Sequence, residues 1–566
     1  MTTHQLDLCL IHAPSVYDFR DRDDVLFAYL SNSDSVHVSP IFEMPPVGLL
    51  SIEQHARGLG LSAGFFNVAS KMLRDPAFSV EAFFERVNAR WVGFDLHWLV
   101  HAHGALALAE LYKRIHPGAK TIFGGISSTF FHDELVRYPQ VDYVVRGYDT
   151  LLPLERLYAA GDRPELLADV PNLTWKLDGE PQVNALSHVP RSYGVSVDWS
   201  DVFRGDQRKR TPYNLVIPQA GCEYSCTWCG GSRYFFSKYM GLTSGPARVH
   251  KPVAELQREL RSVASAGTRA HTLTMVDFWH EYEELFAAAG DVFLDESIHC
   301  VHYSLHRLPK LEKGLRMARG IKAVFELSPD SHDMEVARAS GRGKYTMAEM
   351  EAFIDALIDQ VYSFEIYFLI GLPLQTPESV LETVDYCGEL LRKYRGKNVT
   401  PFICPMLPFL DPGSEISDYP ERFGFTLSHR TVEDHRRALI SLNWKDRLNY
   451  ETKWMSRDQL VDVSYEAVRR LTLLKHEHRQ MPDVYARAIV GRIDRTRELL
   501  RDIDAFQAMA QGPARRARGL EIGAQVLEYN RDQLKQVRSQ QRPIDAGFTK
   551  QQWFDTDAAF DVVMGE

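Results

Sequence analysis

The sequence lacks the features that would send a protein into or across a membrane. No apolar run approaches the roughly 18 residues that a membrane-spanning helix needs. The first residues, MTTHQLDLCLIHAP, show neither the basic start nor the cleavage pattern of a signal peptide. We therefore expect a cytoplasmic protein that uses no membrane.

An excess of positive charge is also missing. The chain has 65 Lys and Arg against 75 Asp and Glu, a formal net charge of -10. Because nucleic-acid binding draws most of its non-specific affinity from a basic surface, this balance argues against a nucleic-acid partner. The local basic run Arg515, Arg516 and Arg518 is interpreted as a solvated helix end.

Cysteine is scarce and unevenly placed. Only seven cysteines occur in 566 residues, and three of them fall within eight positions. A disulfide framework would spread paired cysteines through a small secreted domain, so this pattern indicates metal ligands instead. The other four stand singly in apolar contexts and are interpreted as buried thiols: Cys9, Cys300, Cys387 and Cys404.

Short apolar runs alternate with helical patterns through residues 1–160. We expect strands over residues 6–11, 62–66, 91–94, 120–123 and 143–146, with helices near 48–59, 79–87, 105–115 and 131–138. Strict alternation predicts a parallel sheet covered on both faces, which is a doubly wound, Rossmann-like α/β domain. Its ligand would lie beyond the carboxyl ends of the strands.

Residues 161–205 are rich in Pro, Asp and Gly, and predict a linker with a small hairpin sheet of its own turning at Asp178-Gly179. Residues 206–440 carry a second strand and helix series, which predicts a full or partial parallel (β/α) barrel. Residues 441–566 predict a mostly helical C-terminal region. The strands of the barrel are expected over residues 214–218, 271–276, 297–303, 323–327, 363–370 and 401–405.

Cys222, Cys226 and Cys229 follow the first barrel strand at spacings of four and three. Three thiolates at this spacing can wrap one face of an iron-sulfur cube. A zinc site would need a fourth Cys or His close by, and downstream the sequence offers only His250. Because an iron without a protein ligand is an open, catalytic position, the motif indicates a 4Fe-4S cluster rather than structural zinc.

This CxxxCxxC loop resembles that of the radical S-adenosylmethionine (SAM) superfamily. Gly230 and Gly231 resemble the small-residue turn that the methionine part of SAM approaches, for which glycine is the permissive residue. Trp228 resembles the aromatic position near the adenine. The resemblance therefore implies SAM binding beside the cysteines.

Later segments share the resemblance. Glu326 and Ser328, which we expect at the end of a strand, resemble the Glu-Ser element of the family. Gly371 opens a glycine-leucine-proline loop, and Asp277 ends the second barrel strand, where a polar residue commonly meets the ribose. Any one of these is explained by an ordinary strand-end turn, but together and in order they imply a SAM site.

The first domain resembles the cobalamin-binding module of one large subgroup of that superfamily. Pro46 and Gly48 open its first helix, and Gly124 and Gly125 follow a strand. A glycine pair after a parallel strand lets a nucleotide tail or planar ligand lie close to the backbone. Where the subgroup has Gly-Glu after the last strand, this chain has Gly147-Tyr148-Asp149, which departs from the pattern.

Asp95 and His97 need a separate assignment. Corrinoid proteins with a histidine below the cobalt resemble one another in an Asp-x-His-x-x-Gly loop after the first strand, and here Leu10 replaces that aspartate before His12. Asp95 and His97 lie one strand too late, at about the distance from the glycine pair where a Ser-x-Leu element stands. The resemblance places them near the cofactor's tail and not on the cobalt.

The combined resemblance implies a cobalamin-dependent radical SAM enzyme, reduced by an external donor such as flavodoxin or ferredoxin. A 5′-deoxyadenosyl radical would remove a substrate hydrogen, and methylcobalamin would methylate an unactivated carbon of a small metabolite or peptide intermediate. Two alternatives stay open: the same cofactors used for cyclisation or ring rearrangement, and a non-enzymatic iron-sulfur redox sensor. A methylthiotransferase is rejected because the first domain contains only Cys9.

Overall fold

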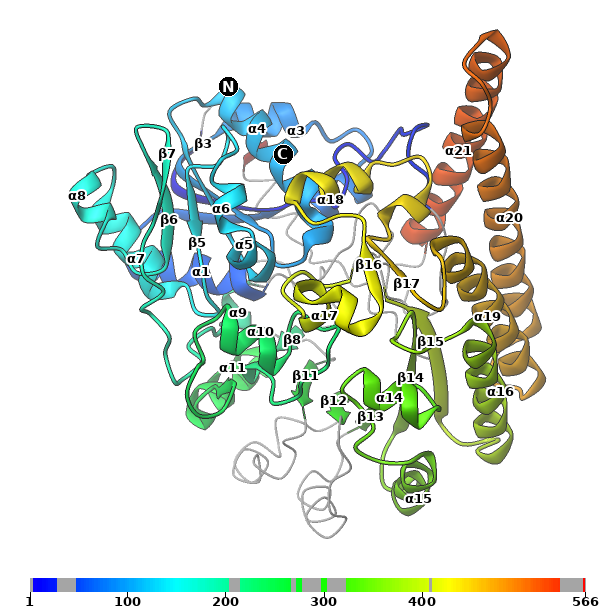
Figure 1. The fold of residues 1–566 in the computed structure, drawn as a ribbon. Helices are drawn as coiled ribbons and strands as arrows, with labels where there is room; N and C mark the ends of the chain where they lie inside the picture. Colours follow the sequence, from blue (N-terminus) through cyan, green and yellow to red (C-terminus); the bar gives the residue numbers. More distant parts are fainter. Residues whose placement is uncertain are drawn as a thin grey trace.

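The protein is described from a computed structural model, which covers residues 4–27, 47–202, 214–265, 271–276, 297–302, 322–406, 410–539 and 563–564. Figure 1 shows two sheets with helices around them and, on the right, a projecting arm made by α20 and α21.

The first sheet has the strand order β2-β1-β3-β4-β5-β6-β7. Its first five strands are parallel, as predicted: β1 (His4–His12), β2 (Ala63–Asn67), β3 (Val87–Asp95), β4 (Lys120–Gly124) and β5 (Tyr143–Val145). Both faces are buried: Leu8 and Leu10 of β1 belong to one core cluster, and Cys9 and Ile11 belong to the other.

Helices cover each face of this sheet. The first cluster takes side chains from α1 (Val47–Gly58) and α7 (Leu151–Ala160), and the second from α3 (Val80–Arg86) and α4 (Ala102–Ile115). One predicted helix, over residues 131–138, is wrong in its bounds. The structure has two short helices there, α5 (Ile126–Phe130) and α6 (His132–Leu135).

The predicted hairpin is present, but it is not a separate sheet. Asp178 and Gly179 both have positive φ (52° and 85°), as a two-residue hairpin turn requires. The strands it joins, β6 (Leu173–Leu177) and β7 (Glu180–Val183), continue the first sheet because β6 pairs antiparallel with β5. The edge of β5 is thereby covered, and the first sheet reaches well into the segment expected to be a linker.

The second sheet is a partial parallel barrel in which the strands follow one another in chain order. Its strands are β8 (Asn214–Val216), β11 (His271–Val276), β12 (Ser297–His302), β13 (Lys322–Asp330), β14 (Ser363–Ile370) and β15 (Val399–Pro405). All adjacent pairs are parallel. The helices packed outside it include α11 (Val253–Ser265) and α16 (Pro377–Lys393).

The C-terminal region is mostly helical, with one exception. The helices are α19 (Arg457–Glu477), α20 (Asp483–Gln507) and α21 (Pro513–Ser539). Near their start, β17 (Tyr450–Thr452) pairs antiparallel with β16 (Phe425–Leu427). In α21 the buried Asn530 accepts from the N–H of Phe27 (2.9 Å), so the last helix packs back onto the first domain.

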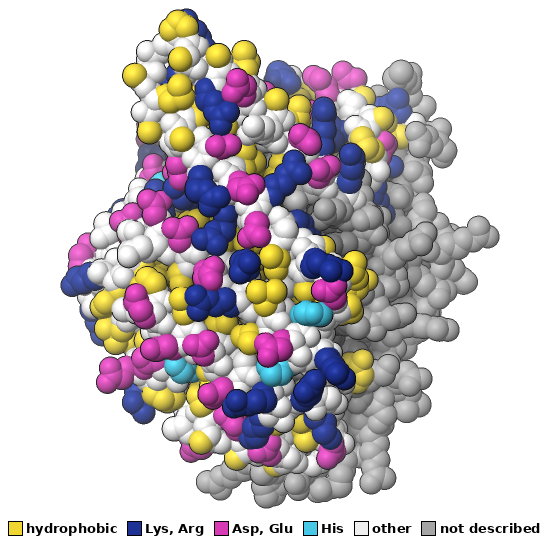
Figure 2. Space-filling model, turned by 90° about the vertical axis from the view of Figure 1, so that its right-hand side faces the viewer, with side chains coloured by type: hydrophobic (Ala, Val, Ile, Leu, Met, Phe, Trp, Pro, Cys, Tyr) yellow, Lys and Arg dark blue, Asp and Glu magenta, His cyan; other side chains and the backbone are white. Residues whose placement is uncertain are grey.

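On the face shown in Figure 2, acidic and basic side chains are intermingled over the described residues. Within α21, Arg518 contacts Asp502 (3.2 Å) and Glu521 (2.9 Å), and Arg515 donates to the carbonyl of Gln507 (2.9 Å). The basic run is therefore a salt-bridged, solvated helix end, as interpreted from the sequence. Among the described helices, none has the length and apolarity to cross a membrane.

A buried ion pair fixes the connecting segment between the two domains. Lys251 and Glu259 form a salt bridge with both side chains fully buried, and Glu259 also accepts from the Val197 N–H (3.4 Å) and the Ser196 hydroxyl (3.3 Å). Replacing Lys251 by Met would leave the carboxylate buried without its cation. We predict that Lys251→Met lowers the free energy of unfolding by about 3–5 kcal/mol in urea titrations.

The matched control for that change is Lys251→Met combined with Glu259→Leu, which removes both charges. The double variant should regain most of the lost free energy of unfolding, because an apolar pair of similar volume often replaces a buried ion pair without cost. Equal losses in the single and double variants would contradict this account.

Candidate active site

The three cysteines lie on the loop between β9 (Gln219–Gly221) and α10 (Arg233–Lys238). Gly221 has φ +84°, and a Cβ there would lie 2.3 Å from the carbonyl oxygen of Ala247, so only glycine fits. The N–H of Cys222 donates to the same carbonyl (3.1 Å). The loop therefore leaves β9 in a fixed direction.

Backbone N–H groups point at two of the sulfurs. Tyr224 N–H donates to Cys222 Sγ (3.4 Å) and Gly231 N–H donates to Cys229 Sγ (3.3 Å). Such hydrogen bonds set the potential of iron-sulfur clusters. Burial raises the pKa of Cys226 to about 12, so the thiolate form of this side chain is disfavoured unless a positive charge lies beside it.

The three cysteines do not form a ready-made site for a single metal ion in this structure. Among the described residues, no three His, Cys, Asp or Glu side chains are grouped to hold one metal ion. A cube places each thiolate on a different iron, so its ligands need not converge on one point. The three-cysteine loop thus suits a 4Fe-4S cluster, as the sequence predicted.

Two distant segments hold the loop from either side. Gly341 has φ +84°, and a Cβ there would lie 2.3 Å from the Ser225 carbonyl oxygen. Thr227 N–H donates to the Ser340 carbonyl (3.1 Å), and Thr227 in turn accepts from the N–H of Ile416 (2.9 Å). These contacts fix the cysteine loop to the segments that follow β13 and β15.

Trp228 is held by a carboxylate that the sequence analysis missed. Its indole Nε1 donates to Asp330 Oδ2 (3.2 Å), and Arg342 Nε donates to the same oxygen (3.0 Å). Burial raises the pKa of Asp330, while the Arg342 charge opposes that shift. Asp330 therefore sets the orientation of the predicted adenine-side aromatic residue.

The expected strand-end position of Glu326 and Ser328 is wrong. Strand β13 continues to Asp330, so both residues lie inside it. Phe325 and Leu327 alternate with them and are fully buried in the core, whereas Glu326 and Ser328 are only partly buried. The two polar residues thus face the opposite side of the strand from that core.

Other predicted SAM residues lie at strand ends as expected, or lie outside the described residues. Gly371 follows β14 with φ +100°, and a Cβ there would lie 2.3 Å from the buried Tyr450 hydroxyl. Gly371 N–H donates to Gln375 Oε1 (2.7 Å). Asp277 lies outside the described residues.

Asp411 is a second residue that the sequence analysis missed. It follows β15, and its Oδ2 accepts from the Gly230 N–H (2.9 Å) directly after the last cysteine. Burial raises the pKa of Asp411 to about 6. Gly230 and Asp411 are 181 residues apart, and no local pattern marks Asp411.

In the first domain, the glycine pair and the Asp95 to His97 segment lie side by side. Gly125 has φ +112°, and a Cβ there would lie 2.6 Å from His97 Cα. Leu96 N–H donates to the Gly124 carbonyl (2.8 Å), and His97 is exposed. This is the cradle expected at the carboxyl ends of β3 and β4.

The structure gives no support to the assignment of Pro46 and Gly48, which open the first helix, to the predicted cobalamin site. Gly48 is exposed in α1, and a Cβ there would meet nothing within 4 Å, so no contact requires glycine at this position. Pro46 lies outside the described residues.

The sequence analysis also missed a pair formed by His12 and Asp95 at the carboxyl edge of the first sheet. His12 Nδ1 lies 2.9 and 3.1 Å from the two carboxylate oxygens of Asp95. Burial would raise the pKa of Asp95, but His12 holds it below its usual value. His12 is 2% exposed, and its ring lies 5.0 Å from that of His101. Only the strand order could have indicated this pair, because His12 and Asp95 end the neighbouring strands β1 and β3.

The helices that follow the glycine turn and the cysteine loop are in contact. Phe130 ends α5, which begins just after Gly125, and its ring packs edge-on against Tyr239 at the end of α10 (5.0 Å). Gly413, two residues after Asp411, would place a Cβ 2.9 Å from Phe130. The glycine cradle and the cysteine loop are thus joined through one aromatic contact.

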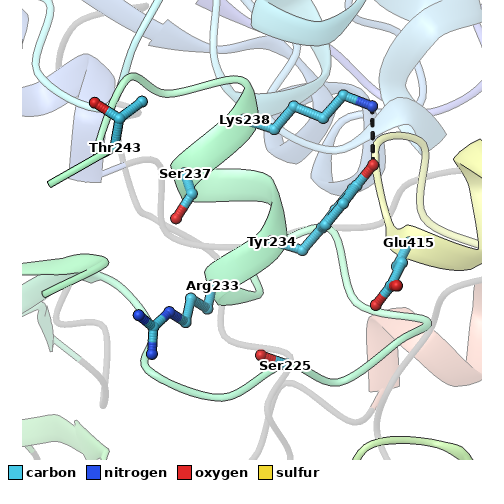
Figure 3. Close-up of a pocket in the computed structure, with 7 residues that line it drawn as sticks. All are labelled: Ser225, Arg233, Tyr234, Ser237, Lys238, Thr243 and Glu415. Atoms are coloured by element: carbon cyan, nitrogen blue, oxygen red, sulfur yellow. Dashed lines mark hydrogen bonds between the residues drawn. The ribbon is translucent and has the colours of Figure 1, made fainter.

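Beside Ser225 of the cysteine loop lies an open hollow of about 460 Å³ (Figure 3). Figure 3 shows Lys238 reaching the Tyr234 hydroxyl (2.8 Å), with Arg233 extending away from them. The lining residues are Ser225, Arg233, Tyr234, Ser237, Lys238, Thr243 and Glu415.

Comparison with known proteins agrees with this geometry. A B12-binding domain model matches residues 36–153, and a radical SAM superfamily model matches residues 216–387. The anaerobic magnesium-protoporphyrin IX monomethyl ester cyclase of Rubrivivax gelatinosus is 23% identical over 344 residues, 56% of each chain. The chain thus matches little more than half the length of this curated relative.

Two solved structures share the fold. The radical SAM methyltransferase TsrM of Kitasatospora setae, with cobalamin and a 4Fe-4S cluster bound, has a TM-score of 0.50 at 13% identity, covering 75% of this chain and 81% of its own. The cobalamin-dependent radical SAM enzyme OxsB has a TM-score of 0.55 at 12% identity, covering 95% and 74%.

The fold and the two matched domains define a two-domain α/β enzyme with an iron-sulfur loop. The chain belongs to the radical SAM enzymes that carry a B12-binding domain. Cobalamin, a 4Fe-4S cluster and SAM are its cofactors.

We predict that Cys226→Ala abolishes cluster binding, because the buried Cys226 is one of the three thiolate ligands that the sequence predicts. Anaerobic reconstitution should give about four irons per wild-type chain. The variant should lose both the brown absorbance and 5′-deoxyadenosine formation. Cys387→Ala, at a buried thiol in α16, is the control and should keep both. Zinc without iron uptake in wild type would refute the cluster.

We predict that Gly125→Ala weakens cobalamin retention and lowers stability by about 1–3 kcal/mol, because alanine is strained at φ +112° and its Cβ would collide with His97. Bound cobalamin per chain after gel filtration and the thermal midpoint measure the two effects. Gly118→Ala is the control, since a Cβ there meets nothing within 4 Å. Normal retention in Gly125→Ala would show that this turn does not shape the cofactor site.

Proposed function

We propose that this radical SAM enzyme uses cobalamin to methylate an unactivated carbon of a small metabolite or peptide intermediate. The observation that carries the proposal is a contact between two helices, each of which follows a candidate cofactor loop. The helix that begins after Gly125 packs on the helix that follows the cysteine loop, through Phe130 and Tyr239. A methyl carrier and a radical source can act on one carbon only if both face a common space.

The cofactors supply the bond-breaking chemistry: reductive cleavage of SAM gives a 5′-deoxyadenosyl radical, and cobalamin carries the methyl group. The protein binds and orients them. Cys222, Cys226 and Cys229 hold the cluster, and Trp228 is fixed by Asp330 for contact with the adenine.

The remaining barrel residues line the SAM side of the site. Gly230 and Gly231 let the methionine part approach the backbone, and Gly371 shapes the loop after β14. Glu326 and Ser328 are partly buried polar groups on the strand face away from the Phe325 core, and we assign them to SAM contacts within the barrel. Asp277 is assigned to the ribose.

In the first domain, Gly124 and Gly125 leave room for the cofactor's tail, with the exposed His97 beside them. The Asp95 carboxylate is engaged by His12, so Asp95 acts by positioning the strand end. Pro46 and Gly48 stay assigned to the mouth of the same site.

The open hollow beside Ser225 is the proposed side from which a flavodoxin or ferredoxin reduces the cluster, because it adjoins the cysteine loop from outside the barrel. We propose a reducing, cytoplasmic setting. None of the six cysteines in the described part of the chain forms a disulfide, which is compatible with a reducing environment.

A second candidate function is radical cyclisation with the same cofactors. The observation that favours it is the 23% identity to a cyclase from Rubrivivax gelatinosus. The two candidates differ in the fate of SAM, because methyl transfer consumes a second molecule of SAM to remethylate the cobalamin.

We predict that turnover with substrate yields both 5′-deoxyadenosine and S-adenosylhomocysteine, together with a metabolite that gains a methyl mass. Anaerobic assays with a chemical reductant, read by mass spectrometry over an untargeted metabolite extract, measure all three. Gly118→Ala is the control variant and should give the same products as wild type, because a Cβ at position 118 has no other atom within 4 Å. Deoxyadenosine without S-adenosylhomocysteine or a methylated product would favour the cyclase.

A further inference from the structure

The loop after β1, residues 13–27, begins at the edge of the first sheet where ligands of such sheets bind. In the strand order β2-β1-β3-β4-β5 the connections change sides between β1 and β3, since α1 packs in one core cluster and α4 in the other. The crevice beyond two such strands is the usual ligand site of a doubly wound sheet. His12 and Asp95, which end these strands, are hydrogen-bonded to each other (2.9 Å). The loop after β1 is therefore expected beside the cobalamin.

The first half of this loop is held within its own domain, by the start of α4. Gly104 N–H donates to the Ser15 carbonyl (3.1 Å), and Tyr17 N–H donates to His103 Nδ1 (3.3 Å). A Cβ at Gly104 would lie 1.7 Å from the Pro14 carbonyl oxygen, so the loop and the helix are in close contact. Residues 13–17 thus depend on no other part of the chain for these bonds.

The second half of the loop is held by one side chain of the last long helix, α21. Asn530 is 2% exposed, and its Oδ1 accepts from the Phe27 N–H (2.9 Å). Its Nδ2 donates to the carbonyls of Arg22 (2.9 Å) and Val25 (2.7 Å). The amide thus uses one acceptor and two donors on three backbone groups, a set that among side chains of this length only asparagine provides.

A second contact from the C-terminal region acts on the same segment. Arg447, also 2% exposed, donates to the Leu26 carbonyl (2.9 Å), and Leu26 N–H donates to the Leu442 carbonyl (3.3 Å). Figure 1 shows the dark blue loop next to the end of α21 that is nearer the first domain. The B12-binding model matches residues 36–153, so neither the loop nor the residues that hold it fall within the matched stretch.

We propose that Asn530 is a positioning residue for cobalamin, which holds the loop after β1 in the conformation that the cofactor binds. A loop released at one end would sample more conformations, and part of the binding free energy would go into ordering it. Helix α21 then serves the cofactor site in addition to packing on the first domain. The inference goes beyond the proposed function, because it requires bound cobalamin but neither methyl transfer nor cyclisation.

The first test uses the wild-type full chain with and without hydroxocobalamin. Amide hydrogen exchange, read by mass spectrometry, reports the opening of each segment. We expect peptides that cover residues 13–27 to exchange more slowly when the cofactor is bound. Unchanged exchange in these peptides would show that the loop does not meet the cofactor and would overturn the inference.

The second test removes the three hydrogen bonds with Asn530→Leu, which keeps the branched shape of the side chain, and with Asn530→Ala, which adds no apolar bulk. Without cobalamin, residues 13–27 should exchange faster in both variants than in wild type. Both should bind hydroxocobalamin about tenfold more weakly, because buried backbone groups lose their partners. Reconstituted iron should stay at the wild-type content, because the cysteine loop makes none of these contacts.

Tyr529→Phe is the matched control, because Tyr529 is the adjacent buried residue of α21 and its hydroxyl bonds to Thr496 of α20 (2.6 Å) instead of to the loop. It should bind cobalamin as wild type does. Equal weakening in Tyr529→Phe would show that any loosening of these helices has the same effect and would overturn the inference. Wild-type cobalamin affinity in the Asn530 variants would also overturn it.

The iron content separates the cofactor role from a role in the fold. If both Asn530 variants lost iron as well as cobalamin, Asn530 would support the whole fold and the positioning role would be refuted. A wild-type protein that held iron but bound no hydroxocobalamin would refute the cobalamin site together with the inference. Deoxyadenosine formed without a methylated product would count against the proposed methyl transfer and leave the predicted binding results unchanged.

Discussion

The fold and the site depend on the backbone contacts that hold the cysteine loop. The loop is bonded at its start to Ala247, in the middle to Ser340, and at Thr227 to Ile416. Thiolates gathered around one cluster repel one another, so a loop free to move would separate them. Contacts from three distant segments hold the sulfurs at one end of the barrel before any cofactor binds.

The same contacts connect the cluster to the first domain. Gly413 lies in the segment that carries Asp411, and it leaves room for Phe130, whose helix begins at the glycine turn of the first sheet. The glycine turn of the first sheet and the cysteine loop, both candidate ligand sites, are therefore connected through packed helices. This arrangement makes the methyl transfer proposal physically reasonable, because neither cofactor has to cross a sheet.

Several polar groups at this junction come in pairs that restrict their motion. Asp330 joins Trp228 and Arg342, and His12 holds Asp95 beside the exposed His97. In each case one member touches the expected cofactor region and the other is buried behind it. Buried partners of this kind orient a group that would otherwise sample several rotamers.

The sequence by itself determined the five parallel strands of the first domain and the barrel strands, because each is a local pattern of alternation. The cluster ligands stay a prediction from the spacing of the three cysteines. It misplaced the end of β13 at Ser328, since the apolar alternation stops where the strand continues through polar residues to Asp330. It also treated β6 and β7 as a separate sheet, because pairing with β5 is not encoded in either strand alone.

Only the tertiary structure identified Asp411 and the His12–Asp95 dyad. Gly230 and Asp411 are 181 residues apart, and His12 and Asp95 are 83 apart. Such pairs depend on which strands lie next to each other and where each one ends. A chain pattern reports the local conformation of a segment, whereas the meeting of two strand ends is set by the packing of the whole sheet.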